Sequence, residues 1–171
     1  MADQDPSNPS RRFLGVLAMW LPAAVAALPS AALAAPCPVP QVLLVCPAGT
    51  VKSAIAREVL KRRAAARGVP LVATSRGVTP EDHVSPALAA HLRADGIDPG
   101  AQPLRRFDPA DAAAADVVIA FDEAAQVPAL RSARVWTTPS WNSDYAAAKA
   151  ALAPQVEALL DELAARGCGG T

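Results

Sequence analysis

The chain is 171 residues long, 52% hydrophobic and 4% aromatic, with 16 basic and 16 acidic side chains. This length fits one ordinary domain, and a net charge of zero excludes a protein that binds nucleic acid through bulk charge. Three cysteines are too few for a disulfide-built scaffold. The mean hydropathy of +0.21 is high for a chain that is 19% charged, which indicates that an apolar segment raises the mean.

That apolar segment lies near the N-terminus. Residues 13–35 carry no charge and follow Ser10-Arg11-Arg12, the order of a basic and then an apolar region in secretory signal peptides. Ala32-Leu33-Ala34 offers a small-residue cleavage site. We therefore predict a signal peptide over residues 1–34 and one domain over residues 35–171. The protein would be exported, periplasmic or secreted, with no stable membrane span after cleavage. The paired arginines are similar to a twin-arginine export signal, and an ordinary secretory signal is the alternative.

The mature chain alternates short apolar runs with longer amphipathic segments. Continuous apolar runs predict buried strands, and apolar residues every three or four positions predict helices. Strands are expected at residues 41–45, 71–75, 116–121 and 134–136, and helices at 53–67, 85–95 and 144–166. Alternating strands and helices favour an α/β fold with parallel strands and right-handed crossovers.

The loop between the first strand and the first helix carries the chemistry. Cys46 ends the strand, and Ser53 opens the helix seven residues later. Backbone N–H groups in such a loop form a nest that binds phosphate-like anions beside the positive end of the helix dipole. The same field favours the thiolate, the nucleophilic form of cysteine. The alternative is an unreactive core cysteine, but the spacing of Lys52 and Ser53 favours a reactive loop.

This loop resembles that of the low-molecular-weight protein tyrosine phosphatases, a family that includes related arsenate reductases. The family carries V-C-x-G-N-x-x-R-S-x-x-A-E after its first strand, and residues 45–58 here read VCPAGTVKSAIARE. Later segments also match, and they cover most of the mature chain. These segments are Ser75-Arg76-Gly77 for S-A-G, residues 85–98 for the next helix and G-I-D, residues 115–122 for A-D-x-I-x-x-M-D, and Trp136 with Pro139 for W-x-x-P-D-P.

The resemblance implies both a fold and a reaction. The implied fold is a three-layer α/β sandwich whose four-stranded parallel sheet is flanked by helices. The implied reaction is hydrolysis of a phosphomonoester through a phosphocysteine intermediate, with no metal or other cofactor. A phosphorylated protein, a small phosphomonoester or another oxyanion would be the partner. The implied catalytic residues are Cys46, Lys52 and Ser53, and the phosphate-binding loop would comprise Pro47, Ala48, Gly49, Thr50 and Val51.

Two departures from the family pattern bear on activity. Lys52 replaces the loop arginine, so a flexible point charge replaces a planar fork that holds two phosphate oxygens. Ser140 falls where the family has its acidic aspartate, and serine does not protonate a leaving group at neutral pH. Asp144 and Asp122 are the candidates for a replacement acid. A catalytically weak or inactive oxyanion-binding relative is therefore the alternative function.

An arsenate reductase is the third hypothesis. The thioredoxin-linked type needs further cysteines, and this chain has none between Cys46 and Cys168; an exported protein also lacks the cytosolic thiol pool. The predicted topology brings Cys37 and Cys168 to the same end of the sheet, which predicts either a disulfide between them or two unpaired cysteines in the chain ends. His83 and His91 lack metal-ligand spacing and are expected on the surface. Nothing in the sequence indicates an oligomeric state.

Overall fold

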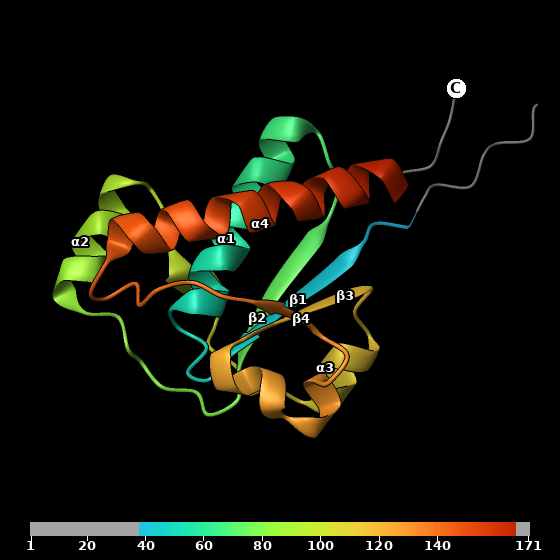
Figure 1. Ribbon diagram of the computed structural model, residues 1–171, viewed down its shortest axis with the longest axis horizontal. Helices are drawn as coiled ribbons and strands as arrows, with labels where there is room; N and C mark the ends of the chain where they lie inside the picture. The colour runs from blue at the N-terminus through green and yellow to red at the C-terminus, as the bar shows by residue number, and fades with distance from the viewer. Residues whose placement is uncertain (1–37, 167–171) are drawn as a thin grey trace, which may run out of the picture. The chain divides into compact units, whose positions relative to one another are not determined.

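The computed structural model describes residues 38–166, so the predicted signal peptide, Cys37 and Cys168 lie outside the described residues. Four parallel strands form one sheet in the order β2-β1-β3-β4 (Figure 1). This arrangement confirms the predicted four-stranded parallel sheet. The strands are β1 (Gln41–Cys46), β2 (Val72–Gly77), β3 (Val117–Phe121) and β4 (Arg134–Trp136).

Helices cover both faces of this sheet, which confirms the three-layer arrangement. In Figure 1, α1 and α4 lie on one side of the strands, and α3 lies on the other. The α-helices are α1 (Lys52–Arg67), α2 (Pro86–Ala94), α3 (Pro109–Ala113) and α4 (Tyr145–Arg166). Three short 3-10 helices, η1 (Pro99–Ala101), η2 (Asp122–Gln126) and η3 (Pro128–Leu130), complete the described elements. No helix within residues 38–166 combines the length and the apolar character needed to cross a membrane.

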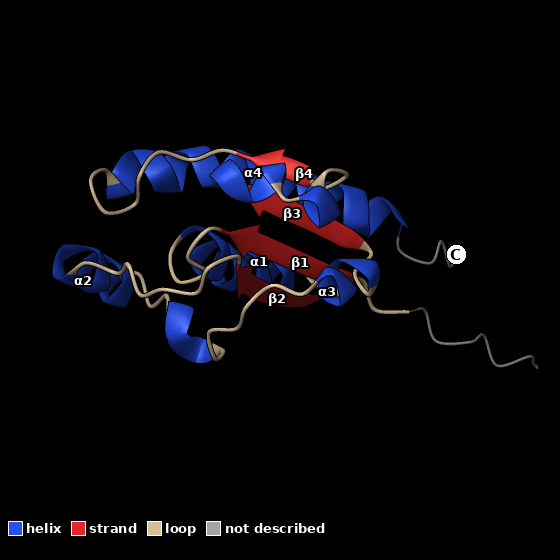
Figure 2. Ribbon diagram, turned by 90° about the horizontal axis from the view of Figure 1, so that it is seen from below, coloured by secondary structure: helices blue, strands red, loops and turns tan. Residues whose placement is uncertain are grey.

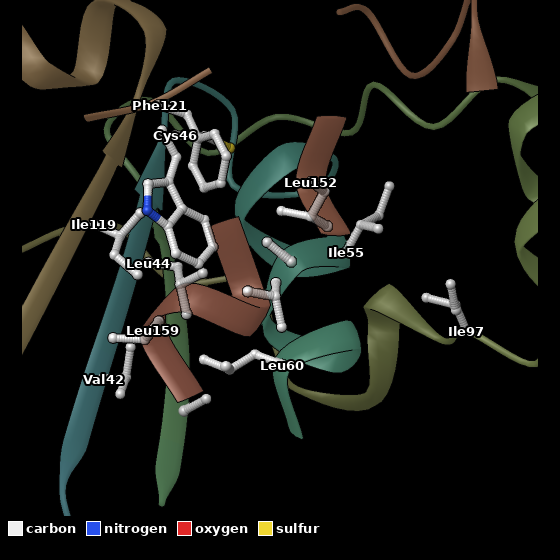
Figure 3. Close-up of a cluster of buried hydrophobic side chains, with 14 of the residues drawn as sticks. Val42, Leu44, Cys46, Ile55, Leu60, Ile97, Ile119, Phe121, Leu152 and Leu159 are labelled. Atoms are coloured by element: carbon white, nitrogen blue, oxygen red, sulfur yellow. The ribbon is translucent and has the colours of Figure 1, made fainter. Parts of the chain in front are cut away.

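The central strand β1 supplies both halves of the core. Its side chains alternate between the two faces of the sheet, and Val42 through Cys46 are all buried because helices cover both faces. One face packs against α1 and α4, and Figure 3 shows this cluster. Its labelled members include Val42, Leu44 and Cys46 of β1, Ile55 and Leu60 of α1, and Leu152 and Leu159 of α4. Leu43 and Val45 face the other cluster, which Ala124 and Leu130 share.

The ends of the helices follow local sequence signals. The Ser85 side chain accepts a hydrogen bond from the Leu88 N–H, so it caps α2 with Pro86 in the first turn. Gly68 ends α1 in the left-handed conformation, with φ of 65°. Both ends agree with the sequence prediction. Helix α3 was not predicted, because five residues are too few to show a helical period. Its start is fixed by a capping box between Asp108 and Asp111.

Candidate active site

The site lies where the parallel strands end. Figure 2 shows the strand arrows pointing to the same side of the sheet, where the loop after β1 begins. Loops at the carboxyl ends of parallel strands are the usual place for a ligand site in open α/β sheets. The structure places residues 47–51 here, directly before the first turn of α1. The site is therefore made by the loop between β1 and α1 together with the loops that follow β2, β3 and β4.

Gly49 lets this loop pack closely against the end of β2. Its φ is +83°, and a Cβ at this position would lie 2.7 Å from the backbone nitrogen of Gly77. A Cβ at Gly77 would in turn lie 2.6 Å from the carbonyl oxygen of Ala48. A side chain at either position would therefore push the loop away from the sheet. The backbone path of the loop depends on this pair of glycines.

The Cys46 sulfur lies at the base of the loop and is held by two donors. The Gly49 N–H and the Ser53 hydroxyl each donate a hydrogen bond to Sγ at 3.1 Å. Cys46 is only 3% exposed. Donors aimed at a buried sulfur stabilise negative charge on it, and the start of α1 adds the positive end of a helix dipole. This environment suits a thiolate nucleophile.

The Lys52 ammonium group is anchored beside the loop. Its Nζ lies 2.8 Å from the Asp122 Oδ1 and donates to the Thr138 carbonyl oxygen at 3.0 Å. Asp122 directly follows β3 and has a φ of 53°, a left-handed conformation that is uncommon for a residue with a side chain. This backbone conformation places the carboxylate where it meets Lys52. The cation thus lies at the site but is shared with a carboxylate and a carbonyl oxygen.

A cavity of about 260 Å³ opens above Cys46. The structure brings most of the predicted loop residues to this cavity, together with Asp122 and Ser140. The residues that line it are Cys46, Pro47, Ala48, Val51, Lys52, His83, Asp122, Ser140, Trp141 and Asn142. Asp144 is not among them, because it lies at the start of α4, where its Oδ1 accepts a hydrogen bond from the Ala147 N–H at 2.9 Å. Of the two candidate acids, only Asp122 faces Cys46.

Gly49 and Thr50 line a different cavity. It measures about 380 Å³ and also contacts the buried Arg57 and Ser75. The Arg57 guanidinium there already donates to the Ser75 hydroxyl at 2.6 Å and to the Pro99 carbonyl oxygen at 2.8 Å. This larger cavity does not include Cys46, so we assign the chemistry to the smaller one. The phosphate-binding loop predicted from the sequence therefore faces two cavities.

His83 and Asn142 reach the Cys46 cavity although the sequence did not indicate it. His83 follows β2 and was expected on the surface, and its side chain is indeed 52% exposed. The segment that contains it runs along the phosphate-binding loop, where the N–H groups of Val78, Thr79 and Glu81 donate to loop carbonyl oxygens. No local pattern signals this approach, because it depends on where the segment crosses the loop. Within residues 38–166, no group of three His, Cys, Asp or Glu side chains could hold a metal ion.

This fold and this cysteine loop define a phosphatase-like α/β class, and the comparison with protein families agrees. Residues 41–154 match the model described as low molecular weight phosphotyrosine protein phosphatase. The chain belongs to this family. A comparison with curated protein sequences found no match.

Solved structures share the fold. YfkJ from Bacillus subtilis has 19% identity and a TM-score of 0.61, covering 76% of this chain and 98% of its own. The low molecular weight phosphotyrosine phosphatase VcLMWPTP-2 from Vibrio cholerae O395 has 17% identity and a TM-score of 0.58, covering 74% and 98%. An arsenate reductase in the phosphate binding state has 20% identity and a TM-score of 0.58, covering 73% and 99%. At these identities the similarity establishes the architecture.

Proposed function

We propose that this protein is an exported, cysteine-dependent phosphatase that hydrolyses phosphomonoesters through a phosphocysteine intermediate. The observation that carries the proposal is the Cys46 sulfur, buried and held by the Gly49 N–H and the Ser53 hydroxyl. Those donors stabilise a thiolate at the base of a loop whose backbone suits an anion. The match to the low molecular weight phosphotyrosine protein phosphatase family over residues 41–154 includes this loop, which resembles the cysteine loop of that family.

The reaction follows from the position of these groups. The Cys46 thiolate attacks phosphorus, and the new S–P bond forms as the P–O bond to the leaving alcohol breaks. Loop N–H groups and the Lys52 ammonium stabilise the equatorial oxygens. The leaving oxygen takes up a proton. Water then attacks the phosphocysteine, which releases phosphate, frees a proton and restores the thiolate.

Lys52 makes the reaction slower than an arginine would. To contact a phosphoryl oxygen, its Nζ must give up part of its interaction with the Asp122 carboxylate or the Thr138 carbonyl oxygen. A phosphoryl group carries close to two negative charges, which is enough to compete with one carboxylate for the ammonium. A single ammonium nevertheless orients the phosphoryl group less well than a planar guanidinium fork.

The same observations support a second candidate, a weak or inactive oxyanion-binding relative. Lys52 is already paired, and Ser140 stands at the cavity where an acid is expected. Such a protein would bind phosphate in the loop without turning over an ester. The arsenate reductase hypothesis ranks third, because a thiol relay needs additional cysteines, and none lies between Cys46 and Cys168.

The substrate is a phosphorylated protein or a small phosphomonoester. The cavity above Cys46 is about 260 Å³, which is below the usual size of a pocket for a drug-sized molecule. It therefore suits a phosphoryl group with one attached ring or short chain. In a phosphoprotein, the rest of the substrate would stay outside the cavity.

Side-by-side assays of wild-type protein and Cys46→Ser with p-nitrophenyl phosphate test the phosphatase. We expect the substitution to reduce turnover by about 1,000-fold or more, the scale that accompanies loss of a catalytic nucleophile. Calorimetry with inorganic phosphate should show binding in both proteins. Equal turnover by both would refute the enzyme. Phosphate binding without turnover by wild-type protein would establish the oxyanion-binding alternative.

The export step is tested separately. We propose that residues 1–34 direct the chain out of the cytoplasm through the twin-arginine route, as the Arg11-Arg12 pair before the apolar segment indicates. A reporter enzyme fused after Ala35 should be exported. Replacing both arginines by lysine should stop export if the route is twin-arginine and leave it unchanged if the segment is an ordinary secretory signal.

A further inference from the structure

The proposed reaction needs a proton donor for the leaving oxygen, and the cavity is lined by one on a different loop from position 140. We propose that the His83 imidazolium is this donor. The inference rests on the proposed phosphatase function and adds a catalytic residue to it. His83 comes from the segment after β2, whereas the residue at the expected acid position, Ser140, comes from the loop after β4. Both line the cavity that contains Cys46.

The backbone of His83 is hydrogen-bonded to residues of two other loops at this end of the sheet. Its N–H donates to the Thr50 hydroxyl oxygen at 3.2 Å, and the same hydroxyl donates to the Glu81 carbonyl oxygen at 2.7 Å. Thr50 belongs to the phosphate-binding loop. In the loop after β4, the Asn142 amide donates to the His83 carbonyl oxygen at 2.8 Å and accepts from the Ser85 N–H at 3.0 Å. His83 is therefore linked both to the loop that would hold the phosphoryl group and to the loop that contains Ser140.

The side chain of His83 is paired with a carboxylate. Nε2 lies 3.0 Å from the Glu81 Oε2, and this contact orients the ring. That pairing occupies Nε2, so in this proposal the second ring nitrogen, Nδ1, is the one that exchanges a proton with the substrate. The imidazole is 52% exposed, so a ligand that enters the cavity can reach it. A carboxylate that holds one nitrogen while the other exchanges a proton is an established division of labour in acid–base catalysis.

The other polar groups of the cavity are less suited to the task. Asp122 is bound to Lys52, with the ammonium 2.8 Å from its Oδ1, so its carboxylate serves as a hydrogen-bond acceptor. Ser140 has a neutral hydroxyl that holds its proton at neutral pH. Asp144 accepts a backbone N–H of α4 and does not line the cavity. Histidine remains as the group whose ordinary proton exchange falls near neutral pH.

The proton can be followed through both steps. In the first, the Cys46 thiolate forms the S–P bond, the ester P–O bond breaks, and the leaving oxygen takes the proton from Nδ1 of His83. The alcohol departs and His83 is neutral. In the second, Nδ1 accepts a proton from the water that attacks phosphorus. The S–P bond breaks, and the products are phosphate, the thiolate and the imidazolium with which the cycle began.

Two esters with different leaving groups test the assignment in the full-length protein. p-Nitrophenolate leaves without a proton, whereas phenolate is a poorer leaving group and depends on the acid. We expect His83→Asn to lower kcat/KM by about 100-fold on phenyl phosphate, the lower range for loss of a general acid, and by less than about tenfold on p-nitrophenyl phosphate. His91→Asn is the matched control, because His91 stacks on Tyr145 with ring centroids 4.8 Å apart and does not line the Cys46 cavity. It should leave both values unchanged.

The outcomes separate this inference from the proposed function. If His83→Asn leaves kcat/KM unchanged on both esters, or lowers kcat/KM on both by the same factor, the assignment of His83 is wrong. The proposed phosphatase function then still stands. If Cys46→Ser retains wild-type turnover, or wild-type protein hydrolyses neither ester, the phosphatase itself is wrong and the inference falls with it. Binding of inorganic phosphate by His83→Asn, measured by calorimetry, should equal that of wild-type protein. A lost phosphate signal would assign His83 to folding or binding and overturn its role as an acid.

Discussion

Cys46 is buried, and the loop after it is buried or half-buried and fixed by backbone contacts, whereas several residues across the cavity lie on exposed loops. The sulfur is 3% exposed and has two hydrogen-bond donors. Across the cavity, Ser140 and Asn142 are exposed and His83 is 52% exposed. Burial restricts which side chains fit, because a change there must satisfy close packing. Exposed loops accept substitutions more freely. The residues across the cavity from Cys46, which include the expected acid position, can therefore change without loss of the fold.

This contrast explains the pattern of agreement with the family. The nucleophile and the serine that supports it are retained at their places, since both are part of the packed end of β1 and the start of α1. The acid position has become Ser140, and nothing around its exposed side chain requires a carboxylate for folding. The difference between the two sides can be tested by substitutions on each.

The largest effect should come from Gly49→Ala on the buried side. The new Cβ would lie 2.7 Å from the Gly77 backbone nitrogen, at a φ of +83°. The steric overlap and the strain of the left-handed backbone would therefore both destabilise the fold. We expect a loss of about 3 kcal/mol in the free energy of unfolding, measured by urea denaturation. Gly68→Ala is the control, because its φ is +65° but its Cβ would meet nothing within 4 Å. It should lose only about 1 kcal/mol. Equal losses would contradict the role of close packing.

On the exposed side, Ser140→Asp should restore a proton donor without harming the fold. In the His83→Asn background, we expect it to raise kcat/KM on phenyl phosphate by about tenfold, which is part of what a general acid contributes. In wild-type protein the gain should be smaller, because His83 already supplies the proton. Ser143→Asp is a neighbouring control whose side chain does not line the cavity. A gain from both substitutions would indicate a general effect of negative charge.

Lys52→Arg tests the phosphate-binding loop, where lysine stands in place of the arginine of the family pattern. The guanidinium can hold two phosphate oxygens at once, so we expect phosphate to bind about fivefold more tightly, or roughly 1 kcal/mol, as charge-assisted hydrogen bonds allow. Calorimetry with inorganic phosphate in the Cys46→Ser background isolates binding from turnover. Weaker binding would show that the pairing of Lys52 with Asp122 and Thr138 positions the loop.

The smallest effect is expected at the contact of α2 with α4, where Asp95, Tyr145 and Lys149 do not line the Cys46 cavity. Hydrogen bonds from Lys149 and from the Tyr145 hydroxyl hold the pKa of the Asp95 carboxyl below its ordinary value. A lowered pKa contributes stability above the unfolded value of about 4, and this contribution is lost as the pH falls through the folded pKa. We expect Lys149→Ala to move the Asp95 pKa upward in an NMR titration. Activity should stay unchanged, and an altered turnover would contradict the separation of this contact from the site.

Much of this architecture can be predicted from local signals. The apolar runs of β1 and β3 predict buried strands, and Ser85, Pro86 and Gly68 mark the ends of helices through capping geometry that neighbouring residues determine. Helix α3 and the three 3-10 helices escaped prediction, because elements of three to five residues carry no period. The local signals for α3 are the capping box between Asp108 and Asp111 and the proline in its first turn, Pro109.

The candidate site likewise has a part that the local sequence predicts and a part that depends on tertiary contacts. The sequence by itself determined the Cys46 loop, the family and the parallel sheet, because the spacing from Cys46 to Ser53 and the buried runs are properties of contiguous residues. Only the tertiary structure decided that Asp122 holds Lys52 and that His83 and Asn142 enter the Cys46 cavity. The contact between Lys52 and Asp122 alone joins residues that are 70 positions apart in the sequence. These contacts depend on how the loops cross at the end of the sheet, and no local pattern encodes that crossing.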